Sequence, residues 1–162
     1  MIKPLVNIFV IIIFVACHPI RQITGTSSAY LQIIVNGDKS IVLGESISIS
    51  IKNTYSNKII IYYPEKLIIE KLEDGNWRKL KILECLCDAP CQASIDKIEL
   101  EPGDLFEINW DQKESWCGPR SASQIRETIF KLATVGMYRV IFMFKSSEGI
   151  ESSAYKNFNI TQ

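Results

Sequence analysis

The sequence predicts an all-β fold, an antiparallel β-sandwich, for residues 29–162. Residues 46–53 alternate almost perfectly between isoleucines (Ile47, Ile49 and Ile51) and polar side chains, which is the period of a strand with one buried face. Short segments of this kind recur along the chain, with turn signals of Gly, Pro, Asn and Asp roughly every eight to twelve residues. Many short strands at that spacing are typical of a sandwich.

Two other early segments have strand patterns. Residues 30–35 form a short apolar run that ends at the turn signal Asn36-Gly37-Asp38, and residues 41–43 continue it. Residues 58–63 are almost entirely apolar or aromatic after Lys58. A strand with two apolar faces is buried on both, so we expect this one to be central in its sheet.

The strongest hairpin signal joins residues 67–72 to residues 77–83. Glu73-Asp74-Gly75-Asn76 lies between them, and Asp-Gly tolerates the positive φ that a tight hairpin requires. Pro64 precedes the hairpin, where it fits a strand edge or a bend because proline has no N–H to donate.

A cysteine-rich loop is expected at residues 84–96. The alternating strand that follows, residues 105–110, places Phe106, Ile108 and Trp110 on one face.

The next segments are less regular. Residues 111–123 are polar, and they are predicted to form a long loop. Residues 125–132 are ambiguous: their apolar positions have helical spacing, but a strand is possible, and we favour a short helix or an irregular edge. Residues 138–144 and 150–160 are expected to be the two closing strands.

Gly136-Met137-Tyr138 resembles the start of the penultimate strand in immunoglobulin-like domains. The order of the alternating strand, the Asp-Gly hairpin, the cysteines, the Pro-Gly turn at 102–103 and this tripeptide is similar to that of the single-domain immunoglobulin-like lipoproteins of bacteria. This resemblance implies an immunoglobulin-like sandwich in which the hydroxyl of Tyr138 bonds back to nearby backbone.

The leading residues 1–16 read as a cleaved signal peptide. Lys3 is the only charge before an apolar run at 5–16, which Asn7 alone interrupts. Such a run fits a signal-peptide core, and it is shorter than the roughly 20 residues that cross a bilayer. The small residue Ala16 precedes the expected cut.

The end of this leader resembles the lipobox of bacterial lipoproteins. Val15, Ala16 and Cys17 match it, and Phe14 stands where leucine is usual. The resemblance implies that Cys17 is diacylated and becomes the N-terminus, so that residues 17–28 tether the domain to membrane lipid at the bacterial envelope, on its periplasmic or surface face. An ordinary cleaved signal and an uncleaved anchor are the alternatives.

The charge balance argues against a nucleic-acid partner. The chain of 162 residues has 18 basic and 18 acidic residues, a formal net charge of zero. Its charges are interspersed, and no stripe of Lys and Arg could contact a phosphate backbone.

Apart from Cys17, four cysteines remain, an even number in a chain bound for an oxidising compartment. A bond between Cys85 and Cys87 would be too tight. The pairings left open are Cys85–Cys91 with Cys87–Cys117, and Cys87–Cys91 with Cys85–Cys117. The alternative chemistry is a site for Zn²⁺ or Cu⁺ made by all four thiolates, although the spacing is not that of a usual zinc knuckle.

No catalytic constellation is expected, and no cofactor. His18 is the only histidine, so no Ser-His or Cys-His pair can form. The acidic residues Glu99, Glu101, Asp104 and Glu107 cluster around an expected turn, where carboxylates are mostly solvated.

These observations predict a non-catalytic binding module with a protein partner of unidentified kind. Trp77, Trp110 and Tyr138 are expected in the core, whereas Trp116, in a polar segment beside Cys117, is the candidate for an exposed contact. Loops held by a sandwich commonly carry such contacts. A protease-inhibitor-like domain that inserts the loop from Cys87 to Cys91 into a protease is an alternative, as is the thiolate metal carrier.

Overall fold

The computed structural model describes residues 30–36, 40–63, 67–90, 96–120 and 126–162, and the regular structure in these ranges consists of strands. The signal peptide, Cys17, the tether and Cys91 lie outside them. No helix long and apolar enough to cross a membrane is found in the described ranges. The strands are β1 (Leu31–Val35), β2 (Ile41–Val42), β3 (Ile47–Asn53), β4 (Ile59–Tyr63), β5 (Leu67–Glu73), β6 (Asn76–Lys79), β7 (Asp96–Leu100), β8 (Leu105–Trp110), β9 (Lys113–Cys117), β10 (Thr128–Leu132), β11 (Gly136–Ser146) and β12 (Glu151–Thr161).

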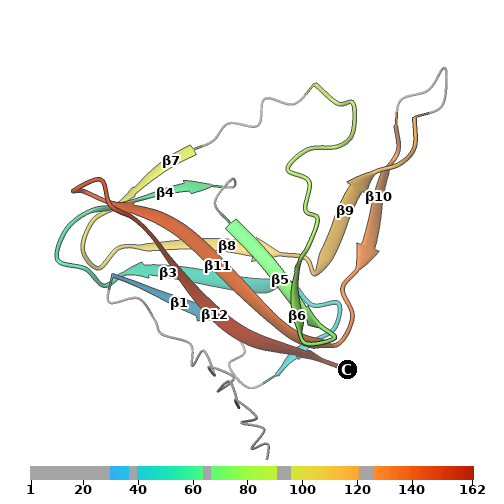
Figure 1. Ribbon diagram of the computed structural model, residues 1–162, viewed down its shortest axis with the longest axis horizontal. Helices are drawn as coiled ribbons and strands as arrows, with labels where there is room; N and C mark the ends of the chain where they lie inside the picture. The colour runs from blue at the N-terminus through green and yellow to red at the C-terminus, as the bar shows by residue number, and fades with distance from the viewer. Residues whose placement is uncertain (1–29, 37–39, 64–66, 91–95, 121–125) are drawn as a thin grey trace, which may run out of the picture.

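The strands form a sandwich-like arrangement, which confirms the predicted all-β class (Figure 1). The smaller sheet has the order β1-β3-β8, and the larger has the order β2-β12-β11-β4-β7. Strand β5 also pairs with β11, and β6 pairs with β5. All of these pairs are antiparallel except that of β12 with β2.

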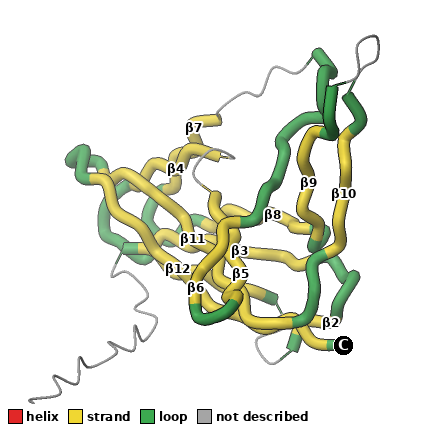
Figure 2. Tube along the Cα trace, turned by 45° about the vertical axis from the view of Figure 1, so that its right-hand side comes forward, coloured by secondary structure: helices red, strands yellow, loops and turns green. Residues whose placement is uncertain are grey.

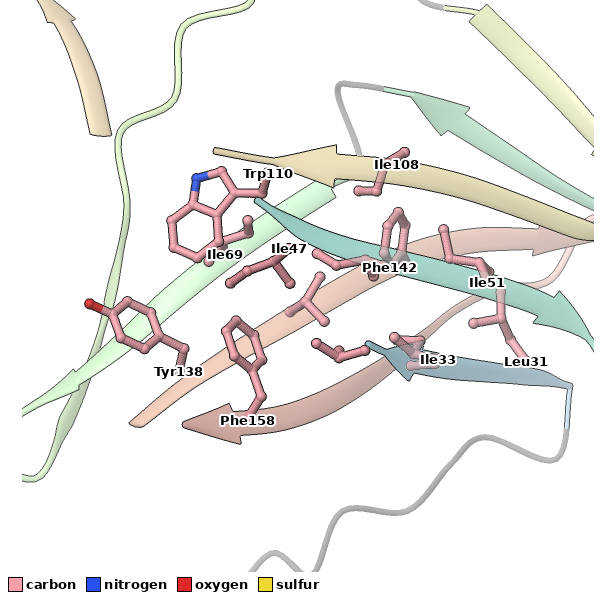
Figure 3. Close-up of a cluster of buried hydrophobic side chains, with 14 of the residues drawn as sticks. Leu31, Ile33, Ile47, Ile51, Ile69, Ile108, Trp110, Tyr138, Phe142 and Phe158 are labelled. Atoms are coloured by element: carbon pink, nitrogen blue, oxygen red, sulfur yellow. The ribbon is translucent and has the colours of Figure 1, made fainter. Parts of the chain in front are cut away.

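The core lies between the two sheets because each contributes one apolar face. Ile47, Ile49 and Ile51 of β3 are buried, as the alternation predicts, and so are alternate residues of β11 from Tyr138 to Phe144. Figure 3 shows Trp110, Tyr138 and Phe158 meeting at one end of this core. Their ring centroids lie 5.8 to 6.4 Å apart. Aromatic side chains at such distances bury much apolar surface in favourable orientations.

The hydroxyl of Tyr138 donates to the carbonyl of Thr134 and accepts from its amide. This is the return bond that the resemblance implied, and it satisfies a phenol whose residue is fully buried. Burial raises the pKa of this phenol above its ordinary value. The immunoglobulin-like topology itself stays a prediction.

The predicted hairpin is confirmed as β5 and β6, with Asp74 (φ 49°) and Gly75 (φ 80°) at its tip. Its second strand ends at Lys79, earlier than expected, because the chain then leaves β5 for β9. Strand β4 lies between β11 and β7, which confirms the central position expected for residues 58–63.

The loop predicted at 111–123 was wrong, because this range contains β9. Residues 125–132 contain β10, which pairs with β9 in a two-stranded sheet, so the favoured short helix was wrong and the strand that was left open is confirmed. The hydrophobic pattern of β9 does not predict a strand because its buried residues include Glu114 and Ser115. Both are polar, and they form hydrogen bonds with residues distant in the chain.

Candidate binding site

Strands β9 and β10 project from the sandwich, with the segment 81–90 running beside β9 (Figures 1 and 2). We call these three pieces the arm. In the view of Figure 1 the arm rises at the right, whereas β1 begins at the left, near the turn between β11 and β12. The arm and the start of the first described strand therefore lie toward opposite ends of the molecule.

A disulfide between Cys87 and Cys117 joins the cysteine-rich segment to β9, with 5.6 Å between the Cα atoms. It excludes the pairing of Cys87 with Cys91, one of the two pairings left open. Cys85 is also disulfide-bonded. The predicted Cys85–Cys91 bond involves a residue outside the described ranges, so it stays a prediction. Bonded sulfurs at Cys87 and Cys117 are not thiolates, so this structure does not support the four-thiolate metal carrier.

Polar contacts reinforce the disulfide at the end of the arm. The amide of Cys87 donates to Thr128 Oγ1 (2.8 Å). Asp88 accepts from the backbone amide of Arg126 (2.9 Å) and from its guanidinium Nη2 (2.7 Å). The hydrogen bonds from the Arg126 guanidinium and amide lower the pKa of Asp88 to about 2. Sequence patterns do not reveal this pair, because its members are 38 residues apart.

Further down the arm, Ser115 holds the segment 81–90 to β9. Its amide donates to the carbonyl of Lys81 (2.8 Å), and its Oγ accepts from the amide of Leu83 (2.7 Å).

At the base, the largely buried Glu114 accepts two hydrogen bonds from the Arg78 guanidinium (2.8 and 3.0 Å). These bonds lower the pKa of Glu114, against the desolvation that would raise it. Gln112 also anchors the base: its side chain is fully buried, donates to the carbonyl of Val42 and accepts from the amide of Gly44.

Trp116, the predicted contact, lies on β9 and is half-buried. It lines an open groove of about 700 Å³ between the arm and β5, together with Leu67, Ile69, Leu80 and Ile82. The candidate residue is thus part of a groove wall rather than of a loop.

The expectation that Trp77 lies in the core was wrong: it is half-buried, and the Arg139 guanidinium lies 4.3 Å from its ring centroid. Trp110 and Tyr138 are in the core as expected.

The acidic cluster is engaged in polar contacts. Glu99 is paired with Lys58 (2.8 Å) and Lys97, and the hydrogen bond from Lys58 is the main cause that lowers its pKa to about 2. Glu107 accepts from Ser50 Oγ, and Asp104 accepts from the amide of Glu101. Within the described ranges, no group of three or more His, Cys, Asp or Glu residues could hold a metal ion.

No protein-family model and no curated protein matches the chain. Among solved structures it is similar to Spo0M, a sporulation control protein of Bacillus subtilis, at 14% identity and a TM-score of 0.35, over 82% of this chain and 49% of that one. It is also similar to a beta-glucosidase of Listeria innocua in complex with gluconolactone, at 14% identity and a TM-score of 0.33, over 82% of this chain and 16% of that one. The chain thus spans about half the length of the first and less of the second, and neither likeness carries a functional argument.

Acid is expected to break the contact between Asp88 and Arg126 only near pH 2. The folded pKa of Asp88 is about 2, below its ordinary value of 3.8, so the stability that the Arg126 contact contributes is present above the ordinary pKa and is lost as the pH falls through the folded one. The chemical shift of the Arg126 amide, followed by NMR during titration, should show a midpoint near 2. Asp88→Asn should remove this transition, and a midpoint near 3.8 in the wild type would contradict the assignment.

Proposed function

We propose that this chain is an envelope lipoprotein, anchored to membrane lipid through acylated Cys17, and that it acts as a non-catalytic binding module through the arm. The observation that supports the arm most strongly is the Cys87–Cys117 disulfide, because it fuses the cysteine-rich segment and the Trp116 strand into one braced projection. Both segments were candidates for contact on sequence grounds, and here they share one surface.

Exposed apolar side chains on the arm support a contact role. Leu86 is 62% exposed and Phe130 is 56% exposed, and Leu132 is exposed on the same strand as Phe130. Single exposed apolar residues are ordinary, but several on one small projection are typical of an interaction surface.

The position of the arm suits an anchored protein. If the anchor is at Cys17, the tether reaches the sandwich at the start of β1, which lies toward the end opposite the arm (Figure 1). An extended tether of about a dozen residues would span at most roughly 40 Å. This arrangement leaves the arm directed away from the attachment point.

The anchor is tested by mass spectrometry of the full chain expressed in a bacterium. We expect a mass that lacks residues 1–16 and gains a diacylglyceryl group, and a Cys17→Ser variant without that gain. An intact leader, or a bare Cys17 thiol, would disprove the anchor without affecting the arm.

The contact surface is tested with a photo-crosslinking amino acid in place of Leu86, in the cells that make the protein. Ile150 is the matched control because it is 61% exposed and belongs to the turn that joins β11 to β12, and this turn lies toward the end of the molecule opposite the arm in Figure 1. We expect discrete crosslinked products from position 86 that are absent from position 150. Equal products from both positions, or none from position 86, would count against the arm.

The protease-inhibitor alternative has weaker support. An inhibitory loop must present its side chains outward, whereas Asp88 is turned to Arg126 and its side chain is only 23% exposed. Unchanged activity of general proteases in the presence of the protein would dismiss this alternative.

A further inference from the structure

The groove beside Trp116 forms where the chain changes its strand partner. The amide of Leu80 still donates to the carbonyl of Ile69 in β5 (2.8 Å), but the carbonyl of Lys81 and the amide of Leu83 bond to Ser115 in β9. After Leu80 the segment therefore diverges from β5, and a wedge opens between them. The groove of about 700 Å³ occupies this wedge.

After the divergence, some backbone N–H and C=O groups form no hydrogen bond to any described residue. In an extended segment, the N–H and C=O groups of successive residues point to opposite sides. Lys81 and Leu83 bond toward β9, so the backbone groups of Ile82, which lies between them, point the other way, toward the groove that Ile82 lines. The structure gives the backbone of Ile82 no hydrogen bond to any described residue.

Strand β5, on the opposite side of the wedge, also directs backbone groups toward the groove. Because Ile69 directs its carbonyl to Leu80, the alternation directs the backbone groups of Leu67, two residues earlier, to the same side. Leu67 pairs with no residue of β6, so its side of β5 faces the groove as an open edge. Unpaired strand edges are templates for the addition of another strand.

The lining of the groove combines apolar and basic side chains. Leu67, Ile69, Leu80 and Trp116 supply apolar surface, and Ile82, which is 42% exposed, adds to it. Among the described residues that line the groove, the basic side chains are Lys79 and Lys81 and the acidic one is Glu84, so this described lining has an excess of positive charge. Its volume is in the range of about 300–1,000 Å³ that is usual for ligand sites.

We propose that the groove binds an extended peptide segment of a protein partner by strand addition to the edges at Ile82 and Leu67. Alternate apolar side chains of the peptide pack on Leu67 and Trp116, and an acidic side chain of the peptide pairs with Lys79 or Lys81. This inference rests on the proposed binding function and names the kind of partner. A small apolar ligand would fill the groove but would leave the amide of Ile82 unpaired, whereas a peptide backbone pairs with it.

The test begins with random linear peptides displayed on phage and selected against the full purified protein. We expect the selected peptides to alternate apolar residues with other residues and to include an acidic one. N-methylation of successive amides in a selected peptide should then weaken binding at every second position, by about three- to tenfold per backbone bond lost. Loss at no position, or at all positions equally, would overturn strand addition.

Variants of the protein locate the peptide. Ile82→Pro removes an amide that bonds to no described residue and should weaken binding by about three- to tenfold. Lys81→Glu should weaken the binding of acidic peptides more than the binding of their amide analogues. This variant keeps the inference testable if Ile82→Pro misfolds. Ile150→Asp, at an exposed position on the β11–β12 turn and outside the groove lining, is the matched control and should leave binding unchanged.

This experiment separates two kinds of failure. Crosslinks from position 86 without periodic N-methyl effects would overturn strand addition and leave the binding module in place. The absence of both crosslinks and selected peptides would overturn both proposals.

Discussion

Replacing Cys87 and Cys117 together with serine is expected to lower the free energy of unfolding by about 3–4 kcal/mol. The two cysteines are 30 residues apart, and the disulfide restricts the unfolded chain by closing a loop of that length. Equilibrium unfolding in urea measures the change, and the double substitution leaves no unpaired thiol behind from this bond.

The same variant should keep its sandwich, because the core between the two sheets contains neither cysteine. Far-UV circular dichroism is therefore expected to be close to that of the wild type, while segment 81–90 exchanges its amide hydrogens faster. Leu86→Ser is the control for a polar substitution at an exposed neighbouring position and should change stability by less than about 0.5 kcal/mol. If the double variant loses less than about 1 kcal/mol of unfolding free energy, the polar contacts of the arm are enough to hold it to the sandwich without the disulfide.

The Arg78→Met variant is expected to lose about 2–3 kcal/mol at neutral pH. The side chain of Glu114 is only 11% exposed, and without Arg78 its charge is left largely buried and unpaired. The value is set below the 3–5 kcal/mol of a fully buried pair because the Arg78 side chain is 43% exposed, and Lys81 still directs its amide to Glu114.

The loss should depend on pH with a definite sign. In the wild type the pKa of Glu114 is lowered, so its contribution to stability is present above the ordinary glutamate value and is lost as the pH falls through the folded value. In Arg78→Met, desolvation without the cation is expected to raise this pKa instead. The difference in unfolding free energy between the two proteins should therefore shrink as the pH falls from above the ordinary value of 4.5, where Glu114 of the variant becomes protonated, to below it, where Glu114 of the wild type does.

A second substitution checks the mechanism. Arg78→Met combined with Glu114→Gln removes the unpaired charge, so it should recover part of the loss at neutral pH. It should also remove the part of the pH dependence that comes from the titration of Glu114 in the single variant. If the single and double variants have the same stability at every pH, the loss comes from the packing of Arg78 rather than from the charge of Glu114.

Features that depend on neighbouring residues were predictable. The alternation of Ile47, Ile49 and Ile51 determines which face of β3 is buried, whatever sheet it joins. The Asp74-Gly75 pair determines the hairpin tip, because its positive φ values are a local requirement. These features yielded the all-β class and most strand positions.

The arm was predicted only in part, because its strands are stabilised by distant residues. Glu114 and Ser115 are polar, and their burial in β9 depends on Arg78, 36 residues from Glu114, and on Leu83, 32 residues from Ser115. A pattern of hydrophobic residues cannot report a buried position that a distant hydrogen bond satisfies. The helical spacing in residues 125–132 failed for a related reason, since pairing with β9 overrides so short a pattern.

The sequence by itself determined the all-β class, the central position of β4 and the candidate role of Trp116 and the four cysteines. Only the tertiary structure decided that Cys87 pairs with Cys117, since two pairings satisfied the chain equally well. It also decided that Trp116 lines a groove between diverging strands. The physical reason is that alternation and turn chemistry act within a few residues, whereas the divergence at Leu80 depends on β5 and β9, which meet the same segment from distant parts of the chain.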